Sequence, residues 1–288
     1  MSHSPFFSIH SLQGLIFDSM KKINVLLALL SFLVFPPFPS QAENAKQLVI
    51  PGTGDSQVLL QKLAVLYSKN RSVSVEIPES IGSGGGIRSV ITGKNELARV
   101  ARPLTEKESA YGLKYRIFAQ APVVFAVSPG VVGTTNLSFE QILGIYSGKI
   151  QQWDELGGGG KMYVMNREDG DSSRSVLENI IPGFKEIPTP VGGMVYSTPD
   201  AVQTLIASPN TIGYLPMPVT VGTELRILQV QNVSPTAANV REKKYQLVVP
   251  FAVVWKDTLS PLAQNFLDFL SSPAAKKLML ENGTIPVD

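Results

Sequence analysis

The chain has 288 residues, a formal net charge of +2, and contents of 44% hydrophobic and 17% charged residues. This composition is typical of a globular protein, and the balanced charge does not indicate a nucleic-acid-binding or membrane-binding surface. The absence of cysteine excludes disulfides, thiol nucleophiles and lipid attachment at a cysteine.

Residues 1–42 have the layout of a secretory signal peptide. Met20 and two lysines form a positive start, residues 23–35 are an apolar run, and Ser-Gln-Ala precedes the expected cut. Met20 is an alternative start of translation. The apolar run is shorter than a spanning helix and is followed by prolines, so we expect an exported protein that begins at Glu43 and does not span a membrane.

Signal cleavage would also remove both histidines of the chain, His3 and His10. The remaining chain would then contain neither histidine nor cysteine. This excludes catalysis by Ser-His-Asp or Cys-His groups and the usual zinc sites. Carboxylates, lysines, tyrosines and hydroxyls remain for catalysis, or for binding without chemistry. We expect binding, with no catalytic residues, no bound metal and no cofactor.

The first strand–turn–helix unit follows directly. Residues 47–50 are a short apolar strand, and Pro-Gly-Thr-Gly-Asp-Ser at 51–56 is a turn. Apolar residues between 58 and 67 then recur at helical spacing, with Asp55 or Ser56 as the expected N-cap.

The second unit has a glycine-rich loop. Residues 72–77 alternate as a strand would, and Ile-Gly-Ser-Gly-Gly-Gly at 81–86 opens a helix at 87–91. Small residues allow backbone N–H groups to approach a ligand, although a flexible loop is an equally simple interpretation. No Gly-Lys-Ser/Thr follows, so the loop is not a P-loop.

The third unit joins a strand at 162–166 to the sequence Asn-Arg-Glu-Asp-Gly-Asp-Ser-Ser-Arg at 166–174, followed by an apolar helical pattern. A helix start offers unpaired N–H groups and the positive end of the helix dipole, and Arg167 adds a charged fork suited to an oxyanion. The same residues also suit an ordinary turn and N-cap.

Strands and helices alternate through the rest of the chain, which predicts an α/β protein with mainly parallel sheets. The further expected strands are residues 96–101, 121–127, 211–215 and 245–255. The further expected helices are residues 138–146, 201–206, 261–270 and 274–280, with 232–244 as a polar loop. The carboxyl ends of parallel strands face one crevice, so we expect the three units to converge on one site.

Together these segments resemble the phosphate-binding proteins of bacterial ABC importers, the PstS-like group of periplasmic solute-binding proteins. The resemblance covers nearly all of the chain after the signal peptide. It rests on Gly-Thr-Gly-Asp-Ser at 52–56, Gly-Ser-Gly-Gly-Gly at 82–86, Arg-Pro-Leu at 102–104, Phe-Glu-Gln-Ile at 139–142 with Gly-Lys-Ile at 148–150 and Trp153, Arg167 to Arg174, Ile-Gly-Tyr at 212–214, and residues 266–273.

The resemblance implies the type II two-lobed fold, in which each lobe is a mainly parallel sheet flanked by helices. Lobe one would be residues 43–120 plus 247–288 and lobe two residues 121–246, joined by two crossover strands. It also implies a monomeric periplasmic receptor that closes around phosphate or a related small oxyanion and serves an ABC permease.

Ligand contacts can be carried over by position. The residues implied to bind the ligand are Ser56, Gln57, Ser83, Arg167, Asp169, Asp171, Ser172 and Ser173. Arg167 would pair with the anion while Asp169 orients it. The serines and the Gln57 backbone would donate hydrogen bonds.

Three positions depart from the family pattern. The family has Asp-Gly-Ser-Gly-Thr where this chain has Asp-Gly-Asp-Ser-Ser at 169–173, so Asp171 replaces a serine donor. Ala101 replaces an aspartate that accepts the ligand's proton, and Asp55 adds a second new acid. A carboxylate facing phosphate would repel it, so a ligand with a cation or hydroxyls, or a protein partner sensed without phosphate, is the alternative. Glycoside chemistry by the local carboxylates is the least favoured hypothesis.

Overall fold

The structure, a computed structural model, describes residues 46–287, and the predicted signal peptide lies outside the described residues. The strands are β1 (Lys46–Val49), β2 (Val73–Glu76), β3 (Ala98–Val100), β4 (Lys114–Val127), β5 (Asn136–Leu137), β6 (Tyr163–Arg167), β7 (Gly193–Val195), β8 (Thr211–Pro216), β9 (Arg226–Ile227), β10 (Gln229–Val230), β11 (Val248–Trp255) and β12 (Ile285–Pro286). The α-helices are α2 (Gln57–Ser68), α3 (Gly82–Ile91), α4 (Glu106–Ser109), α5 (Phe139–Tyr146), α6 (Ser172–Ile180), α7 (Thr198–Ala207), α8 (Ala237–Arg241), α9 (Pro261–Phe269) and α10 (Pro273–Glu281), and two 3-10 helices are η2 (Trp153–Leu156) and η3 (Met217–Val219). Within residues 46–287, no helix has the length and apolar character needed to cross a membrane.

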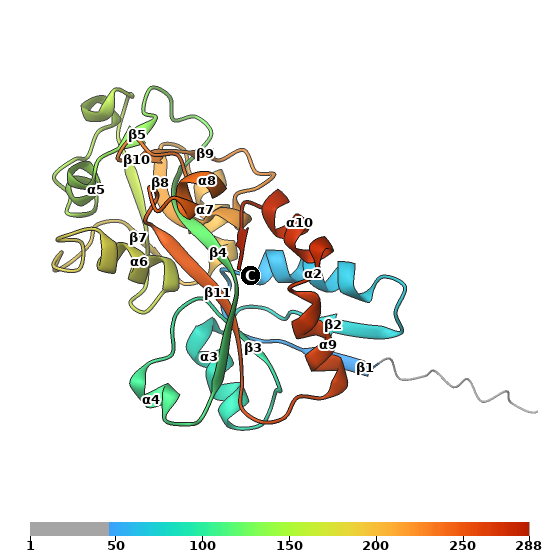
Figure 1. The fold of residues 1–288 in the computed structure, drawn as a ribbon. Coiled ribbons are helices and arrows are strands. Elements are labelled where there is room, and N and C mark those ends of the chain that lie inside the picture. Colours follow the sequence, from blue (N-terminus) through green and yellow to red (C-terminus); the bar gives the residue numbers. More distant parts are fainter. Residues whose placement is uncertain (1–45, 288) are drawn as a thin grey trace, which may run out of the picture. The chain divides into compact units, whose positions relative to one another are not determined.

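The long strand β4 organises the main sheet, whose order is β3-β11-β4-β8-β6-β7. Its first part, from Lys114 to Pro122, pairs antiparallel with β11, and its last part, from Val123 to Val127, pairs antiparallel with β8. In Figure 1, α3, α4 and β3 lie around one end of this pair of long strands, and α5 and α6 lie around the other end.

The expected α/β class is confirmed, but the expectation of mainly parallel sheets needs correction. Parallel pairing joins β1 to β2, β10 to β5, and β6 to both β7 and β8. Antiparallel pairing joins β11 to β3 and β4, and β4 to β8, β9 and β12. The difference has a simple cause, because β4 and β11 are long enough to contribute many of the pairs and run in opposite directions.

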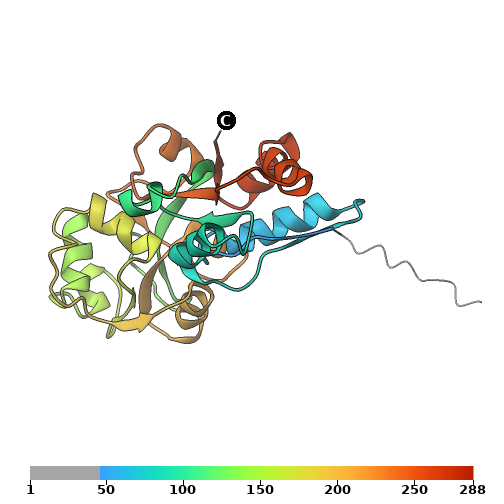
Figure 2. The same ribbon diagram turned by 90° about the horizontal axis from the view of Figure 1, so that it is seen from below.

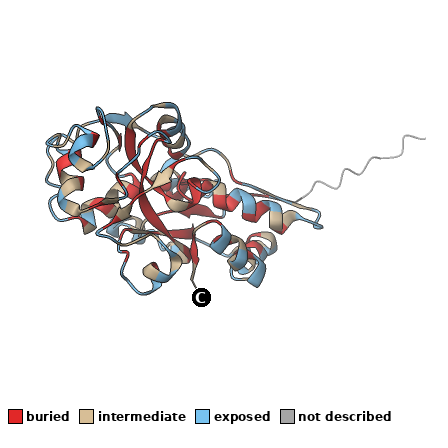
Figure 3. Ribbon diagram, turned by 90° about the horizontal axis from the view of Figure 1, so that it is seen from above, coloured by how far each residue is buried: buried red, intermediate tan, exposed pale blue. Residues whose placement is uncertain are grey.

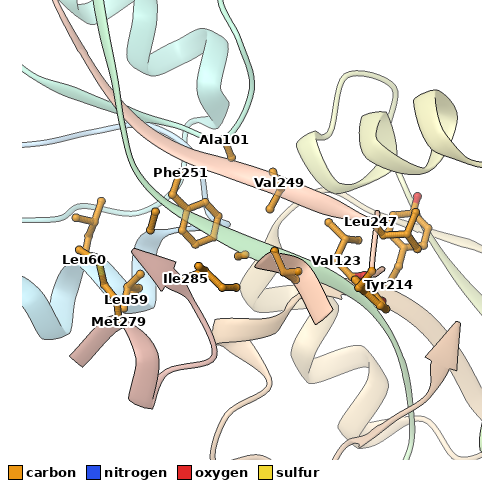
Figure 4. Packing of buried hydrophobic residues seen from close by; sticks show 14 of the residues in the cluster. Leu59, Leu60, Ala101, Val123, Tyr214, Leu247, Val249, Phe251, Met279 and Ile285 are labelled. Carbon is orange, nitrogen blue, oxygen red and sulfur yellow. Dashed lines mark hydrogen bonds between the residues drawn. The ribbon is translucent and has the colours of Figure 1, made fainter. Parts of the chain in front are cut away.

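Apolar side chains of β4 and β11 belong to one large core cluster and to two smaller ones. Phe251 on β11 and Ile285 on β12 lie near Leu59 on α2, whereas Val123 on β4 and Tyr214 on β8 lie further along the sheet (Figure 4). Figure 3 shows this buried stripe following the strands, with exposed residues on the outer helix faces. Figure 2 shows α2 lying along the side of the β1–β2 ribbon, where its buried leucines complete the core.

Helix starts follow the local chemistry of their N-caps. Ser138 and Gln141 form a reciprocal capping box at α5. Serine caps followed by proline start α9 and α10, because proline at the first helical position needs no hydrogen-bond partner for its nitrogen.

Several elements differ from the sequence-based expectation. Helix α3 begins at Gly82, so the expected glycine-rich loop is the first part of this helix and does not precede a helix at 87–91. The short strands β5, β7, β9, β10 and β12 were not predicted. The β4 strand begins at Lys114, before the expected 121–127, because its polar first half still pairs with β11. The polar segment 232–244 contains the short helix α8, which Thr236 caps. Helix α4 was not predicted, and its Thr105–Glu108 capping box stabilises a single turn.

Candidate functional site

The first loop is held against β3 by backbone hydrogen bonds. The Arg99 N–H donates to the Pro51 carbonyl at 2.9 Å, and the Thr53 N–H donates to the Arg99 carbonyl at 3.2 Å. Gly52 has a φ of +143°, and a Cβ there would lie 1.9 Å from the Arg99 carbonyl oxygen, so this approach requires glycine. The loop then places Asp55 in a buried position immediately before α2.

The Arg99 side chain also holds this loop, through hydrogen bonds from its guanidinium. It donates to the carbonyls of Ile50, Thr53 (2.8 Å) and Pro78 (2.7 Å), and it reaches the side-chain oxygen of Gln57 at 3.4 Å. Sequence patterns did not reveal this role, because the acceptors are mainly backbone carbonyls 21 to 49 residues earlier in the chain. Arg99 therefore ties together the segments that lead into the first and second loops.

The first turn of α3, expected as a glycine-rich loop, brings Ser83 to Ser172 of α6. Their Oγ atoms lie 3.5 Å apart, and the Ser83 Oγ also accepts from the Ala101 N–H at 3.1 Å. The first turns of α3 and α6 therefore meet, as the predicted convergence of the second and third units required.

Arg167, at the end of β6, is paired with an acid of its own chain. Its Nη2 lies 2.8 Å from Asp171 Oδ2, and both side chains are almost completely buried. The other Asp171 oxygen accepts from the Arg174 N–H at 2.9 Å, so Asp171 also caps α6. The arginine is held further by the Val195 carbonyl (3.0 Å) and by the Thr198 hydroxyl (3.4 Å).

This geometry corrects the role expected of Asp169. That carboxylate points to solvent, 90% exposed, and pairs with Arg174 at 2.7 Å rather than orienting Arg167. Asp171 orients Arg167 instead, because the turn at Gly170 carries the chain back so that the residue four positions on reaches the guanidinium.

A fourth helix start reaches the site and was not predicted. Thr198, the first residue of α7, donates from its hydroxyl to Asp55 Oδ1 at 2.9 Å, and Ser173 donates to Asp55 Oδ2 at 3.3 Å. The sequence offered one signal, since Ser197 and Pro199 around Thr198 form an N-cap followed by an early proline.

These segments enclose a cavity of about 220 Å³. Its lining consists of Thr53, Gly54, Asp55, Ser80, Ile81, Gly82, Ser83, Arg167, Glu168, Gly170, Asp171, Ser172, Tyr196 and Thr198.

Four of the eight residues implied by the resemblance line the cavity, and the other four lie outside the lining. Gln57 is engaged by Arg99, Ser173 by Asp55, and Asp169 by Arg174. Ser56 is buried, and its hydroxyl has no hydrogen-bond partner among the residues that the structure describes.

Burial sets the protonation of two acids at the cavity. Desolvation, reinforced by the neighbouring Asp171 carboxylate, raises the pKa of Asp55 to about 7 against the opposing effect of Arg167. Desolvation also raises the pKa of Glu168, whose Oε2 is buried and has no partner within residues 46–287. No group of three or more acids in this part of the chain is arranged to hold a metal ion.

A small polar cavity at converging helix N-termini, in an α/β fold crossed by long strands, is typical of solute-binding proteins. The PBP superfamily domain matches residues 39–274, and the chain belongs to that family.

Comparisons with individual proteins agree with this assignment. The chain is 25% identical to the phosphate-binding protein PstS of Borreliella burgdorferi over 279 residues, covering 93% of this chain and 99% of that protein. It is 28% identical to PstS of Bacillus subtilis over 246 residues, covering 83% of this chain and 80% of that protein. A substrate-binding protein of Clostridium perfringens, solved with bound phosphate, has a TM-score of 0.77 and 27% identity, covering 84% of this chain and 100% of that chain. The PstS-like resemblance and the two-lobed periplasmic-binding-protein fold are thereby confirmed.

Proposed function

We propose that this protein is an exported solute-binding protein that captures phosphate or a related oxyanion for an ABC importer. One observation carries the proposal: the first turns of α3, α6 and α7 and the Arg167 guanidinium all reach one cavity of about 220 Å³. Free N–H groups at helix starts and a guanidinium are the donors that an oxyanion requires. The cavity is smaller than the roughly 300 Å³ and upward of sites for drug-sized ligands, which suits a small ion.

The ligand would be held between two lobes, residues 43–120 with 247–288 and residues 121–246. Support comes from β4, which exchanges β11 for β8 as its partner between Pro122 and Val123. The cavity lining draws on residues before and after this point, so hinge closure would complete it.

Export would follow from cleavage after residue 42, which places the protein in the periplasm. The partner would be an ABC permease, and the receptor would act as a monomer without catalysis. The PstS relatives, which are phosphate-binding proteins rather than enzymes, support this assignment. Mass spectrometry of the exported protein tests it, because cleavage should leave Glu43 as the first residue.

A second candidate function is a PstS-like receptor for another ligand or for a protein partner. The buried ion pair between Arg167 and Asp171 favours it, because this carboxylate already neutralises the guanidinium. A phosphate dianion would enter a cavity whose arginine has no surplus charge.

Thermal shifts after unfolding and refolding, which strip carried-over ligand, test both candidates. Phosphate, sulfate, molybdate and tungstate would each be added at about 1 mM, and a ligand at about a hundred times its Kd stabilises by roughly 2.7 kcal/mol. Stabilisation by phosphate supports the first function. No shift with any of the four anions contradicts it and favours the second.

A further inference from the structure

The charges around the cavity do not match those of a simple anion receptor. Its lining includes one arginine, Arg167, and three acids, Asp55, Glu168 and Asp171. Each helix N-terminus adds only about half a positive charge. Because Asp171 already balances Arg167, an inorganic dianion would meet only these partial positive charges, and the ionised forms of Asp55 and Glu168 would repel it.

Arg167 can donate hydrogen bonds to a ligand but has little charge to offer it. Three of its five N–H groups have acceptors in the described part of the chain: the Val195 carbonyl, the Thr198 hydroxyl and the Asp171 carboxylate. Two N–H groups are left for a ligand oxygen. The charge of the guanidinium is already balanced by Asp171 at 2.8 Å.

Neither Asp55 nor Glu168 has a cation within ion-pair distance among residues 46–287, although Arg167 acts on both at longer range. Asp55 accepts hydrogen bonds from two hydroxyls, those of Thr198 (2.9 Å) and Ser173 (3.3 Å). Glu168 has a buried, unpartnered Oε2 on the cavity wall. Two acids at the same cavity without an ion-pair contact fit a positive group on the ligand.

Other parts of the lining suit an oxyanion and a cation separately. Ser83 and Ser172, whose Oγ atoms are 3.5 Å apart, mark where the starts of α3 and α6 present donors. Tyr196, which is 72% exposed and also lines the cavity, offers an aromatic ring of the kind that attracts ammonium groups.

We propose that the ligand is a small zwitterion in which an oxyanion and an ammonium group are joined by a short chain, as in an aminoalkylphosphonate. The oxyanion takes the free donors of Arg167 and of the α3 and α6 starts, and the ammonium takes Asp55 and Glu168. This inference rests on the proposed oxyanion-binding function and specifies its ligand class.

Isothermal titration of refolded protein with aminoethylphosphonate, ethylphosphonate and inorganic phosphate tests the inference. Ethylphosphonate has the same oxyanion but no ammonium, so the pair isolates the contribution of the positive charge. We expect aminoethylphosphonate to bind at least tenfold more tightly than ethylphosphonate. Equal binding of the two, or tighter binding of phosphate, overturns this inference and leaves the proposed function intact. No binding of any of the three overturns the inference, and the proposed function falls with it if sulfate, molybdate and tungstate also give no thermal shift.

Two near-isosteric variants locate the cation subsite. Asp55→Asn and Glu168→Gln should each reduce the preference for aminoethylphosphonate over ethylphosphonate to less than threefold. Glu178→Gln is the matched control, because Glu178 pairs with Arg174 at 2.8 Å and lies outside the cavity lining. An unchanged preference in both cavity variants, with circular dichroism showing that they are folded, also overturns the inference.

Discussion

Arg99 and Arg167 are both almost completely buried, but their surroundings differ. Arg99 donates to three backbone carbonyls and one side-chain amide, and no acid lies within ion-pair distance of it in residues 46–287. Arg167 pairs with a buried carboxylate and lines the cavity. Burial lowers the pKa of Arg99 to about 10, so it remains charged at neutral pH.

The difference separates a positioning arginine from a binding arginine. The donors of Arg99 are directed to backbone carbonyls, so its charge holds the loops that lead to Asp55 and Ser83. Arg167 lines the cavity and retains two N–H groups without an acceptor among residues 46–287. We therefore expect substitution of Arg99 to lower the free energy of unfolding alone. Substitution of Arg167 should lower ligand affinity, and it should also lower stability because the buried Asp171 is left unpaired.

The largest effect is expected for Arg99→Met. It removes the donor from several buried acceptors, and each unsatisfied carbonyl costs about 1–3 kcal/mol, so the free energy of unfolding should fall by about 4 kcal/mol. Urea denaturation measures the change. Arg241→Met, on the exposed end of α8, is the control and should change stability by less than about 0.5 kcal/mol. If the free energy of unfolding falls by less than about 0.5 kcal/mol in both variants, Arg99 does not have the structural role inferred here.

Arg167→Ala is expected to act on binding. Loss of a buried, charge-assisted contact should weaken the affinity for whichever oxyanion stabilises the wild-type protein by a hundredfold or more, about 3 kcal/mol. Titration calorimetry measures it. Arg174→Ala removes a neighbouring arginine that does not line the cavity and should change affinity by less than threefold. A loss of affinity under threefold for Arg167→Ala would contradict the proposed role of Arg167 in binding.

The contrast between these arginines also shows what local sequence can predict. The start of α6 was predicted because aspartate and serine at a helix start act on their own neighbours. The start of α3 was expected at residue 87 and lies at Gly82, because the glycines of the expected loop are themselves helical. Ser83 and Ser172 nevertheless came together as expected. The pairing of Arg167 with Asp171, rather than Asp169, depends on how one turn directs two side chains, and sequence spacing does not determine that.

Long-range contacts explain the remaining differences. The role of Arg99 depends on carbonyls from segments that only the finished fold brings together. Thr198 lies 143 positions after Asp55 in the sequence, so its hydrogen bond to Asp55 was not predicted. The start of α7 was also expected at residue 201 and not at Thr198. The overall fold was predictable because apolar periodicity and the order of motifs are properties of the whole chain.

Asp55, which lies at the same cavity as Arg167, should make the free energy of unfolding depend on pH. Its pKa is about 7 in the folded protein against an ordinary value of 3.8, so the folded state holds the proton more tightly. The free energy of unfolding should therefore fall as the pH rises from about 4 to about 7 and then level off. Asp55→Asn lacks this loss and should be more stable than wild type at pH 8, by on the order of 2 kcal/mol.

Thermal denaturation across this pH range measures the effect. Asp268→Asn, which removes a carboxylate that is 61% exposed, is the control and should follow the wild-type curve. Parallel curves for wild type and Asp55→Asn would show that the buried carboxyl does not take up a proton on folding.

The smallest expected effect is the change in phosphate affinity caused by Asp171→Ser. This variant also compares the roles of Arg167 and Arg99 most directly. Serine is also a favourable N-cap, so α6 should retain its start while Arg167 loses its internal counter-ion. The freed guanidinium should then bind inorganic phosphate about tenfold more tightly, equivalent to about 1.4 kcal/mol. Asp169→Ser, which removes the exposed acid two positions earlier, is the matched control and should leave phosphate affinity unchanged. If Asp171→Ser binds phosphate no better than wild type, the carboxylate does not limit anion binding, and Arg167 would resemble Arg99 in serving the fold rather than the ligand.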